Sequence, residues 1–184
     1  TWFDPALVAA LASVGQDSSF WTTLASPGID QAVQALEPGA HVVPLDESYL
    51  DDIAEAFGQV VDAKSPYTSG HSTRVAAYTE RIATQLGLST AHTRWLRRGA
   101  LLHDMGKLGV SNTVLDKPGK LDANEWASVQ AHAAYTQDIL GRIGAFAELA
   151  RISSAHHERL DGKGYPLGLA SDQIRIETRI ITTA

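Results

Sequence analysis

GALLHDMGKLGV, residues 99–110, sets His103 beside Asp104 at the end of a predicted helix. AHHERLDGKGYP, residues 155–166, sets two more histidines side by side before a glycine-rich loop. Pairs of metal-ligating side chains on separate helical segments indicate one site that several packed helices build together. These two stretches therefore predict a helical fold around a metal centre.

Six side chains qualify as metal ligands, and they fall in four short clusters. They are His71, His103, Asp104, His132, His156 and His157. Five of the seven histidines belong to this set, whereas histidines of a hydrophobic core would be scattered singly. A single histidine on an apolar helix face is more often a hydrogen-bonded core residue than a ligand. That alternative stays open for His71 and His132, and it is preferred for His41 and His92.

The chemistry that this donor set favours is metal-dependent hydrolysis of a phosphodiester. Two metal ions about 3.5–4 Å apart can activate water and polarise the phosphate together. Because consecutive helical residues point about 100° apart, His103 and Asp104 can approach the ions from different sides, with Asp104 as the bridge. The same geometry is expected for His156 and His157. Imidazole and carboxylate donors without sulfur favour iron, manganese, nickel, cobalt or zinc.

The hydrophobic pattern predicts an all-α fold. Apolar residues recur at helical spacing through most of the chain, and alternating β patterns and long repeats are absent from the sequence. The apolar stripe that begins at His71 places this histidine on a buried helix face. Asp122 and Glu125 form a capping box at the start of a helix whose apolar face includes His132. The four tryptophans are expected to pack against other side chains rather than to carry chemistry.

Residues 1–45 differ from the rest, because they carry short helical segments separated by breakers and no evident chemistry. Asp4 and Pro5 predict a helix start, and Gly15 predicts its end. We expect a helical appendage over 1–45 and a single larger domain over 46–184.

Composition narrows the partners and the compartment. The formal charge of -6 excludes a surface that binds nucleic acid non-specifically, since neutralising many phosphates needs clustered lysine and arginine. The sequence has no cysteine, which excludes thiolate metal sites and fits a reducing cytoplasm. No apolar run approaches the roughly 20 residues of a membrane-spanning helix, so no membrane segment is expected.

The motifs resemble those of the HD-GYP branch of the HD-domain phosphohydrolases, from about Asp46 to Ala184. The matching stretches are SPYTSGHSTRV, GALLHDMGKLGV, LDKPGKL, AHHERLDGKGYPLGL and RIITTA. The resemblance implies a helical bundle that hydrolyses the bacterial second messenger cyclic di-GMP to a linear dinucleotide and onward to GMP. It implies that the six candidate side chains bind two divalent metal ions, iron or manganese, with Asp104 and Lys107 as catalytic residues. It also implies substrate contacts from Lys107, Asp161, Lys163 and Tyr165.

Two departures from the family pattern carry expectations of their own. Tyr67 stands where members with three metals have a glutamate, so a two-metal site is expected. The family's last helix carries a further metal-ligating Asp, which would follow Ala184 here. The resemblance therefore implies a domain that is incomplete at its C-terminal end, with weakened metal binding and activity. WFDPALV, residues 2–8, resembles the last helix of another HD-GYP unit, so residues 1–45 are expected to be the tail of a preceding unit.

Two alternatives remain. One is an HD-superfamily phosphohydrolase that acts on another nucleotide or cyclic dinucleotide. The other is a regulatory module that binds a ligand or a signalling-protein partner without turnover. The motif HHERLDGKGYP argues against the first, and the complete set of six ligands argues against the second.

Overall fold

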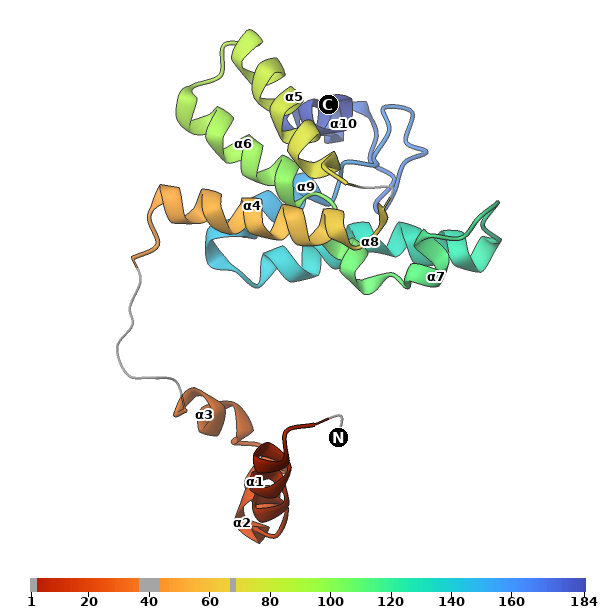
Figure 1. Ribbon diagram of the computed structural model, residues 1–184. Helices are drawn as coiled ribbons and strands as arrows, with labels where there is room; N and C mark the ends of the chain where they lie inside the picture. The colour runs from red at the N-terminus through yellow and green to blue at the C-terminus, as the bar shows by residue number, and fades with distance from the viewer. Residues whose placement is uncertain (1–2, 37–43, 67–68) are drawn as a thin grey trace. The chain divides into compact units, whose positions relative to one another are not determined.

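The computed structural model describes residues 3–36, 44–66 and 69–184, which form two compact units, Thr1–Pro44 and Leu45–Ala184 (Figure 1). The boundary lies one residue before the position expected from the sequence. Over the described residues the secondary structure is helical, and its only β feature is an isolated bridge between Asp161 and Ala170. The predicted all-α fold is confirmed.

The first unit contains three short helices, α1 (Pro5–Gly15), α2 (Ser18–Leu24) and α3 (Ile29–Gln34). The carboxylate of Asp4 accepts hydrogen bonds from the amides of Ala6 and Leu7 and so caps the start of α1. Helix α1 begins at Pro5 and ends at Gly15, as the sequence predicted. None of the residues in these helices is buried. Side-chain caps therefore stabilise the starts of α1 and α2, whereas α3 has no side-chain cap.

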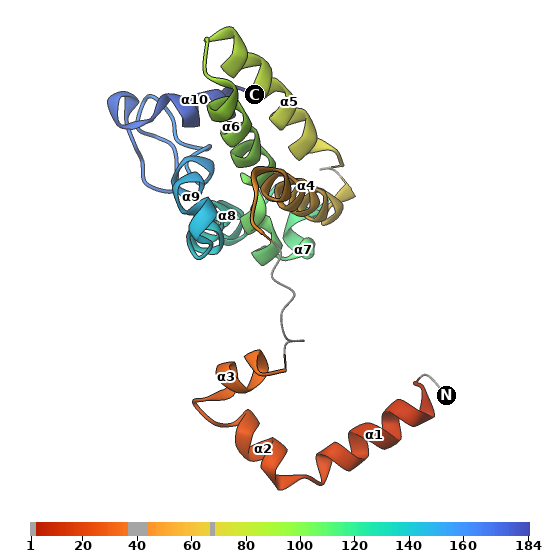
Figure 2. The same cartoon turned by 90° about the vertical axis from the view of Figure 1, so that its left-hand side faces the viewer.

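The second unit is a bundle of packed helices (Figure 1 and Figure 2). Its helices are α4 (Glu47–Ala63), α5 (His71–Gln85), α6 (Thr90–Leu102), η2 (Met105–Gly109), α7 (Asn112–Leu115), α8 (Ala123–Gly141), η3 (Gly144–Phe146), α9 (Ala147–Ser153), η4 (Ser171–Gln173) and α10 (Ile176–Thr183). Helix α6 contacts α4, α5, α9 and α10. Its Leu96, Leu101 and Leu102 are fully buried, and burying each stabilises the fold by roughly 2 kcal/mol.

Charged side chains fix α4 against α6. The buried guanidinium of Arg98 donates to the carboxylates of Asp51 and Glu47, and Arg94 also bonds Asp51. A buried charge is tolerated only when it is paired in this way. The orientation of α6 thereby fixes where His103 and Asp104, which directly follow this helix, lie in the bundle.

Two helices end earlier than the sequence predicted. Helix α6 ends at Leu102 and α9 ends at Ser153, so both pairs of adjacent ligands lie in the turns that follow. The expectation that His156 and His157 are consecutive helical residues is wrong. The hydroxyl of Ser154 bonds Gln137 and the carbonyl of Arg151, and such side-chain bonds compete with continuation of a helix.

None of the helices in the described ranges combines the length and the apolar character that crossing a bilayer requires.

Candidate metal centre

The six predicted ligands converge on one place from four parts of the bundle. His71 is the first residue of α5, His132 lies on α8, and the two adjacent pairs follow α6 and α9. They form two groups of three, and within each group the potential ligand atoms all lie within 4.8 Å of one another. The acidic triad consists of His71, His103 and Asp104, and the histidine triad consists of His132, His156 and His157. The rings of His103 and His156 join the triads, with centroids 4.7 Å apart.

Burial differs along the centre. His103, Asp104, His132 and His156 are all buried, whereas the side chain of His71 is 39% exposed. The expected burial of His71 on an apolar stripe is therefore only partly correct. His71 is the first residue of α5, and its side chain lines the cavity of the centre while remaining partly open to solvent.

The turn that carries His103 and Asp104 is held against α8 by Thr136. The hydroxyl of Thr136 accepts from the amide of Gly106 at 2.9 Å and donates to the carbonyl of His103 at 3.1 Å. A Cβ atom on Gly106 would overlap the carbonyl oxygen of His132. The backbone of the turn therefore lies directly on the helix that supplies His132. Sequence reasoning missed Thr136, because nothing local marks a contact between segments 30 residues apart.

Asp62 fixes the start of α5 in a similar way. The buried carboxylate of Asp62 accepts from the amide of Ser72 at 3.1 Å and from its hydroxyl at 2.7 Å. A carboxylate at a helix N-terminus is favourable both as a hydrogen-bond acceptor and as a negative charge. Asp62 thereby positions the adjacent His71. It also escaped sequence reasoning, since it lies at the end of the preceding helix, α4.

Three of the imidazoles donate Nδ1–H to the backbone carbonyl three residues before them. The pairs are His103 with Ala100 at 2.7 Å, His132 with Val129 at 2.5 Å and His156 with Ser153 at 2.6 Å. With Nδ1 used in this way, the lone pair is on Nε2. The three Nε2 atoms lie 3.2–3.7 Å from the Asp104 carboxylate. Metal-ligating histidines are commonly held by a backbone carbonyl in this manner.

Asp104 is an ionised carboxylate at the point where the triads meet. Burial raises the pKa of Asp104, but His103, Lys107 and His156 oppose this and hold the pKa well below its usual range. Its Oδ2 accepts from the Lys107 ammonium at 2.7 Å. Its Oδ1 is buried and has no hydrogen-bond partner among the residues that the structure describes. That oxygen is available to a cation.

The pKa values of the five histidines in the centre are lowered with one exception, His103. Burial lowers the pKa of His132, of His156 and of His157, in the last case to about 4. Burial also lowers the pKa of His71. For His103 burial acts in the same direction, but the charge and hydrogen bond of Asp104 raise its pKa above the ordinary value.

These observations fit metal ions better than a hydrogen-bonded core. The Nε2 atoms of His132 and His156 face each other at 3.4 Å, although each ring already donates through Nδ1. Two lone pairs that face each other repel, and a cation between them removes the repulsion. Nitrogen and carboxylate donors without sulfur suit transition-metal ions. The residues present therefore fit a metal centre in which Asp104, a member of the acidic triad, faces the histidine triad through Oδ1.

The loop of residues 158–169, which we call the signature loop, is anchored by Glu158. Its buried carboxylate accepts from the amides of Leu167 at 2.6 Å and Leu169 at 2.8 Å. Each of these bonds is charge-assisted and partly shielded from water, which strengthens it. The loop is thereby closed on itself next to the histidine triad.

Tyr165 covers one side of the centre from the signature loop. Its ring stacks on His157 with centroids 4.7 Å apart and an interplanar angle of 25°. The ring of Trp126 meets Tyr165 edge-on at 6.3 Å. Trp126 is 48% exposed and Trp21 is exposed as well, yet each packs edge-on against another aromatic ring, Tyr165 and Phe20 respectively.

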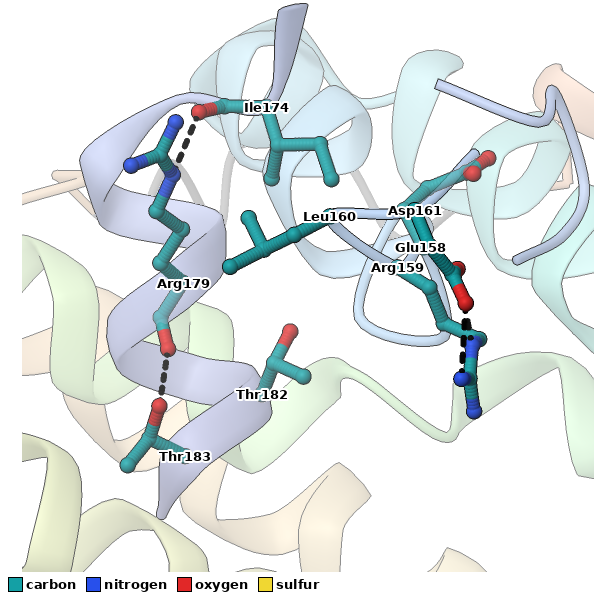
Figure 3. Close-up of a pocket in the computed structure, with 8 residues that line it drawn as sticks. All are labelled: Glu158, Arg159, Leu160, Asp161, Ile174, Arg179, Thr182 and Thr183. Atoms are coloured by element: carbon teal, nitrogen blue, oxygen red, sulfur yellow. Dashed lines mark hydrogen bonds and ion pairs between the residues drawn. The ribbon is translucent and has the colours of Figure 1, made fainter. Parts of the chain in front are cut away.

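The other predicted substrate residues lie apart from the ligands. Asp161 is exposed and forms an ion pair with Arg159 (Figure 3), and this pair lowers the pKa of Asp161 to about 2. It lines a hollow of about 580 Å³ between the signature loop and α10 (Figure 3). Lys163 is exposed. The structure thus places Lys107 and Tyr165 at the centre, and the roles of Asp161 and Lys163 stay predictions.

Three positions outside the centre complete the comparison with the sequence. His92 lies next to Glu177, with Nε2 3.4 Å from the carboxylate, and it belongs to neither triad. Tyr67, on which the two-metal expectation rests, and His41 both lie outside the described residues.

A family model described as the HD domain matches residues 55–184, a stretch that contains all six ligands. The chain belongs to the HD-domain family. The HD-GYP resemblance is likewise confirmed by relatives that are cyclic dinucleotide phosphodiesterases.

Two curated relatives of this chain are described as phosphodiesterases of different cyclic dinucleotides. A 3′3′-cGAMP-specific phosphodiesterase 3 of Vibrio cholerae is 57% identical over 183 residues, which cover 100% of this chain and 40% of the relative. A cyclic di-GMP phosphodiesterase of Thermotoga maritima is 34% identical over 140 residues, which cover 75% of this chain and 38% of the relative. The chain therefore spans about two fifths of the length of these curated relatives.

A solved structure agrees with the fold. The crystal structure of a cyclic GMP-AMP-specific phosphodiesterase of V. cholerae matches with 52% sequence identity and a TM-score of 0.52. The match covers 99% of this chain and 41% of that one.

Proposed function

We propose that the HD domain of this chain, over residues 46–184, hydrolyses a phosphodiester bond of a cyclic dinucleotide with two divalent metal ions, iron or manganese. The observation that carries the proposal is the meeting of the two triads at Asp104, which has one buried oxygen without a hydrogen bond among the described residues. Three Nε2 atoms face that carboxylate, and each is oriented by a backbone carbonyl. Such a donor set supports two ions that share one carboxylate.

The division of labour follows from the positions of the side chains. When bound, a metal pair supplies an activated water nucleophile and positive charge beside the phosphoryl oxygens. The Lys107 ammonium lies 2.7 Å from Asp104 at the edge of the centre, where it can bind a phosphate oxygen and stabilise the negative charge of the transition state. The neutral imidazoles of the histidine triad hold their ligand atoms in place without adding charge. Tyr165 excludes water from one face of His157.

For the substrate we propose 3′3′-cGAMP before cyclic di-GMP. Three V. cholerae relatives that are 57%, 42% and 39% identical bear the description of 3′3′-cGAMP-specific phosphodiesterases. Relatives described as cyclic di-GMP phosphodiesterases are less similar, at 37% in Xanthomonas campestris, 34% in T. maritima and 38% over a shorter stretch in Pseudomonas aeruginosa. The motifs alone suggested cyclic di-GMP first, and the identities of the relatives support placing 3′3′-cGAMP before it. A signalling-protein partner and a cytoplasmic location stay predictions.

The test is a hydrolysis assay with both cyclic dinucleotides on protein loaded with Mn²⁺ or Fe²⁺. We expect the linear dinucleotide as the first product, faster turnover of 3′3′-cGAMP than of cyclic di-GMP, and no turnover after chelation of the metal. Tight binding of the dinucleotide without any product would refute the enzymatic function and favour the regulatory module. Turnover of neither dinucleotide together with hydrolysis of a mononucleotide would favour a different HD-domain phosphohydrolase.

A further inference from the structure

A second cavity lies beside the metal centre, and the residues around it include three lysines. It has a volume of about 350 Å³ and is bordered by the end of α4, by α7 and by the first turns of α8. Lys64, Lys107 and Lys117 line it. Between them the walls are apolar and include Val61, Val114, Leu115, Leu121 and Val129. We call this hollow the lysine cavity.

The lysine cavity adjoins the metal centre at Lys107. This side chain lines both the lysine cavity and the cavity of about 260 Å³ that His71, His103 and Asp104 also line. A ligand whose phosphate lies at the metal centre next to Lys107 can therefore extend past this side chain toward the lysine cavity. The volume falls at the lower end of the range of roughly 300–1,000 Å³ for small-molecule sites, which suits part of a ligand rather than the whole.

The charges in this cavity are unusual for the protein. The chain has a net charge of -6, yet three lysines line one hollow, and one of them, Lys107, is paired with Asp104. The ammonium of Lys64 donates to a neutral acceptor, the carbonyl of Leu108, at 3.2 Å, and in the described part of the chain no carboxylate lies within ion-pair distance of it. Lys117 is paired with Glu125 at 2.6 Å. A cation that no carboxylate neutralises attracts an anionic ligand.

A cyclic dinucleotide presents the groups that such a cavity binds. It has two phosphodiesters, of which the metal centre takes one, and the second keeps its negative charge during the reaction. Each phosphate is flanked by a purine nucleoside, whose flat and largely apolar base suits a wall of valine and leucine. Resting on the proposed function, we infer that the lysine cavity binds the non-scissile half of the cyclic dinucleotide. Lys64 and Lys117 bind its phosphate, and the apolar wall contacts its base.

A purely structural role is the competing explanation for these lysines. Lys117 bonds the glutamate of the capping box of α8, so it would then serve only to hold the start of that helix. Lys64 would serve only to bond the carbonyl of Leu108. A structural role affects stability and every substrate equally, whereas a role in binding affects only substrates that reach the cavity.

The experiment compares Lys64→Gln and Lys117→Gln with Lys120→Gln in the 184-residue chain. Lys120 is an exposed lysine of the same loop as Lys117 that does not line the cavity, so it controls for the change in net charge. Two probes are used on each Mn²⁺-loaded variant. They are 3′3′-cGAMP and bis(p-nitrophenyl) phosphate, which has a single phosphate and reports on the metal centre alone. The KM, the kcat and the calorimetric Kd for 3′3′-cGAMP are measured.

We expect Lys64→Gln and Lys117→Gln each to raise the KM and the Kd for 3′3′-cGAMP by about fivefold. The kcat, the metal content and the hydrolysis of bis(p-nitrophenyl) phosphate should stay at the values of Lys120→Gln. An unchanged KM and Kd in both variants, or an equal loss with both probes, would overturn the inference. If 3′3′-cGAMP binds but is not hydrolysed, the proposed function fails, and the Kd values of the variants still decide the role of the cavity. If the wild-type protein turns over cyclic di-GMP but neither binds nor hydrolyses 3′3′-cGAMP, the proposed function stands, and the Kd values of the variants for cyclic di-GMP decide the role of the cavity. If it binds and hydrolyses neither dinucleotide, both proposals fail.

Discussion

The two triads of the metal centre differ in charge, exposure and protonation, although they share similar ligand atoms. The acidic triad contains the only carboxylate of the six ligands and is partly open to solvent at His71. The histidine triad consists of three imidazoles, and burial lowers the pKa of each. The difference indicates that one half of the centre supplies the charge that binds the ions, while the other half supplies neutral, rigid ligands. Five changes test this division, from the largest expected effect to the smallest.

Removing the carboxylate should affect both halves. We expect Asp104→Ala to lose both ions and to reduce hydrolysis by more than about 100-fold, because the shared ligand and its charge disappear together. Helical content should stay near that of the wild type, since the apolar core does not depend on this side chain. Metal analysis and circular dichroism check these outcomes. Retention of a full metal complement would show that Asp104 is not a shared ligand.

Removing the ammonium next to the acidic triad should separate chemistry from metal binding. We expect Lys107→Met to lower kcat by about 100-fold, because a charged group aimed at the phosphate is lost. The metal content should remain, since Lys107 is a hydrogen-bond partner of Asp104 and not a ligand. Steady-state kinetics beside metal analysis make the measurement. If the variant loses the metal together with activity, Lys107 supports the centre rather than the reaction.

Within the histidine triad, His132→Ala should weaken the binding of one ion by about 10- to 100-fold and leave the other in place. The matched control is His92→Ala, which removes an imidazole of α6 that belongs to neither triad. Titration of Mn²⁺ into both variants gives the comparison. Equal losses in the two variants would mean that His132 is a core histidine.

The pH dependence of metal binding should belong to the acidic triad alone. The pKa of His103 is raised beside Asp104, so near pH 6 this ring holds a proton that a metal ion must displace. The other four imidazoles have lowered pKa values and are already neutral there. Affinity should therefore fall as the pH falls through the raised pKa of His103, by up to about tenfold per pH unit below it, with release of about one proton.

Calorimetry with Mn²⁺ in buffers of different ionisation enthalpy counts the protons. Release of two or more would show that the histidine triad is also protonated in the metal-free protein, contrary to this division between the triads.

The smallest effect is expected from the aromatic cover of the histidine triad. Tyr165→Ala should weaken metal binding by about threefold to tenfold, because the ring stacked on His157 is lost. Tyr165→Phe retains the ring and should behave as the wild type in metal binding. If the two variants are equally impaired, the hydroxyl rather than the stacking is responsible.

The sequence singled out the six side chains that the structure brings together in the two triads, because adjacent donors and helical spacing are local features. The capping of α1 by Asp4 and of α8 by Asp122 and Glu125 was predictable for the same reason, and the structure confirms both. Local signals also explain why helices form over residues 3–36, where the structure shows no buried helix residue.

Contacts between distant segments were not predictable in this way. Asp62 and Thr136 hold the segments that carry ligands, yet neither belongs to a motif that one sequence reveals. The exposure of His71 depends on the packing around the first residue of α5, and the early end of α9 depends on hydrogen bonds of Ser154. Periodicity describes a helix in isolation, whereas these features depend on its neighbours.

The contact between the turn after α6 and helix α8 sets the width of the metal centre. At Gly106 a single hydrogen atom separates two backbones, since a methyl group there would overlap the carbonyl of His132. Any larger residue at this position would move Asp104 and His132 apart, and these two residues belong to different triads. The spacing of the two triads is thus set by a residue that belongs to neither, and a change there would alter the width of the site without altering any of the six predicted ligands.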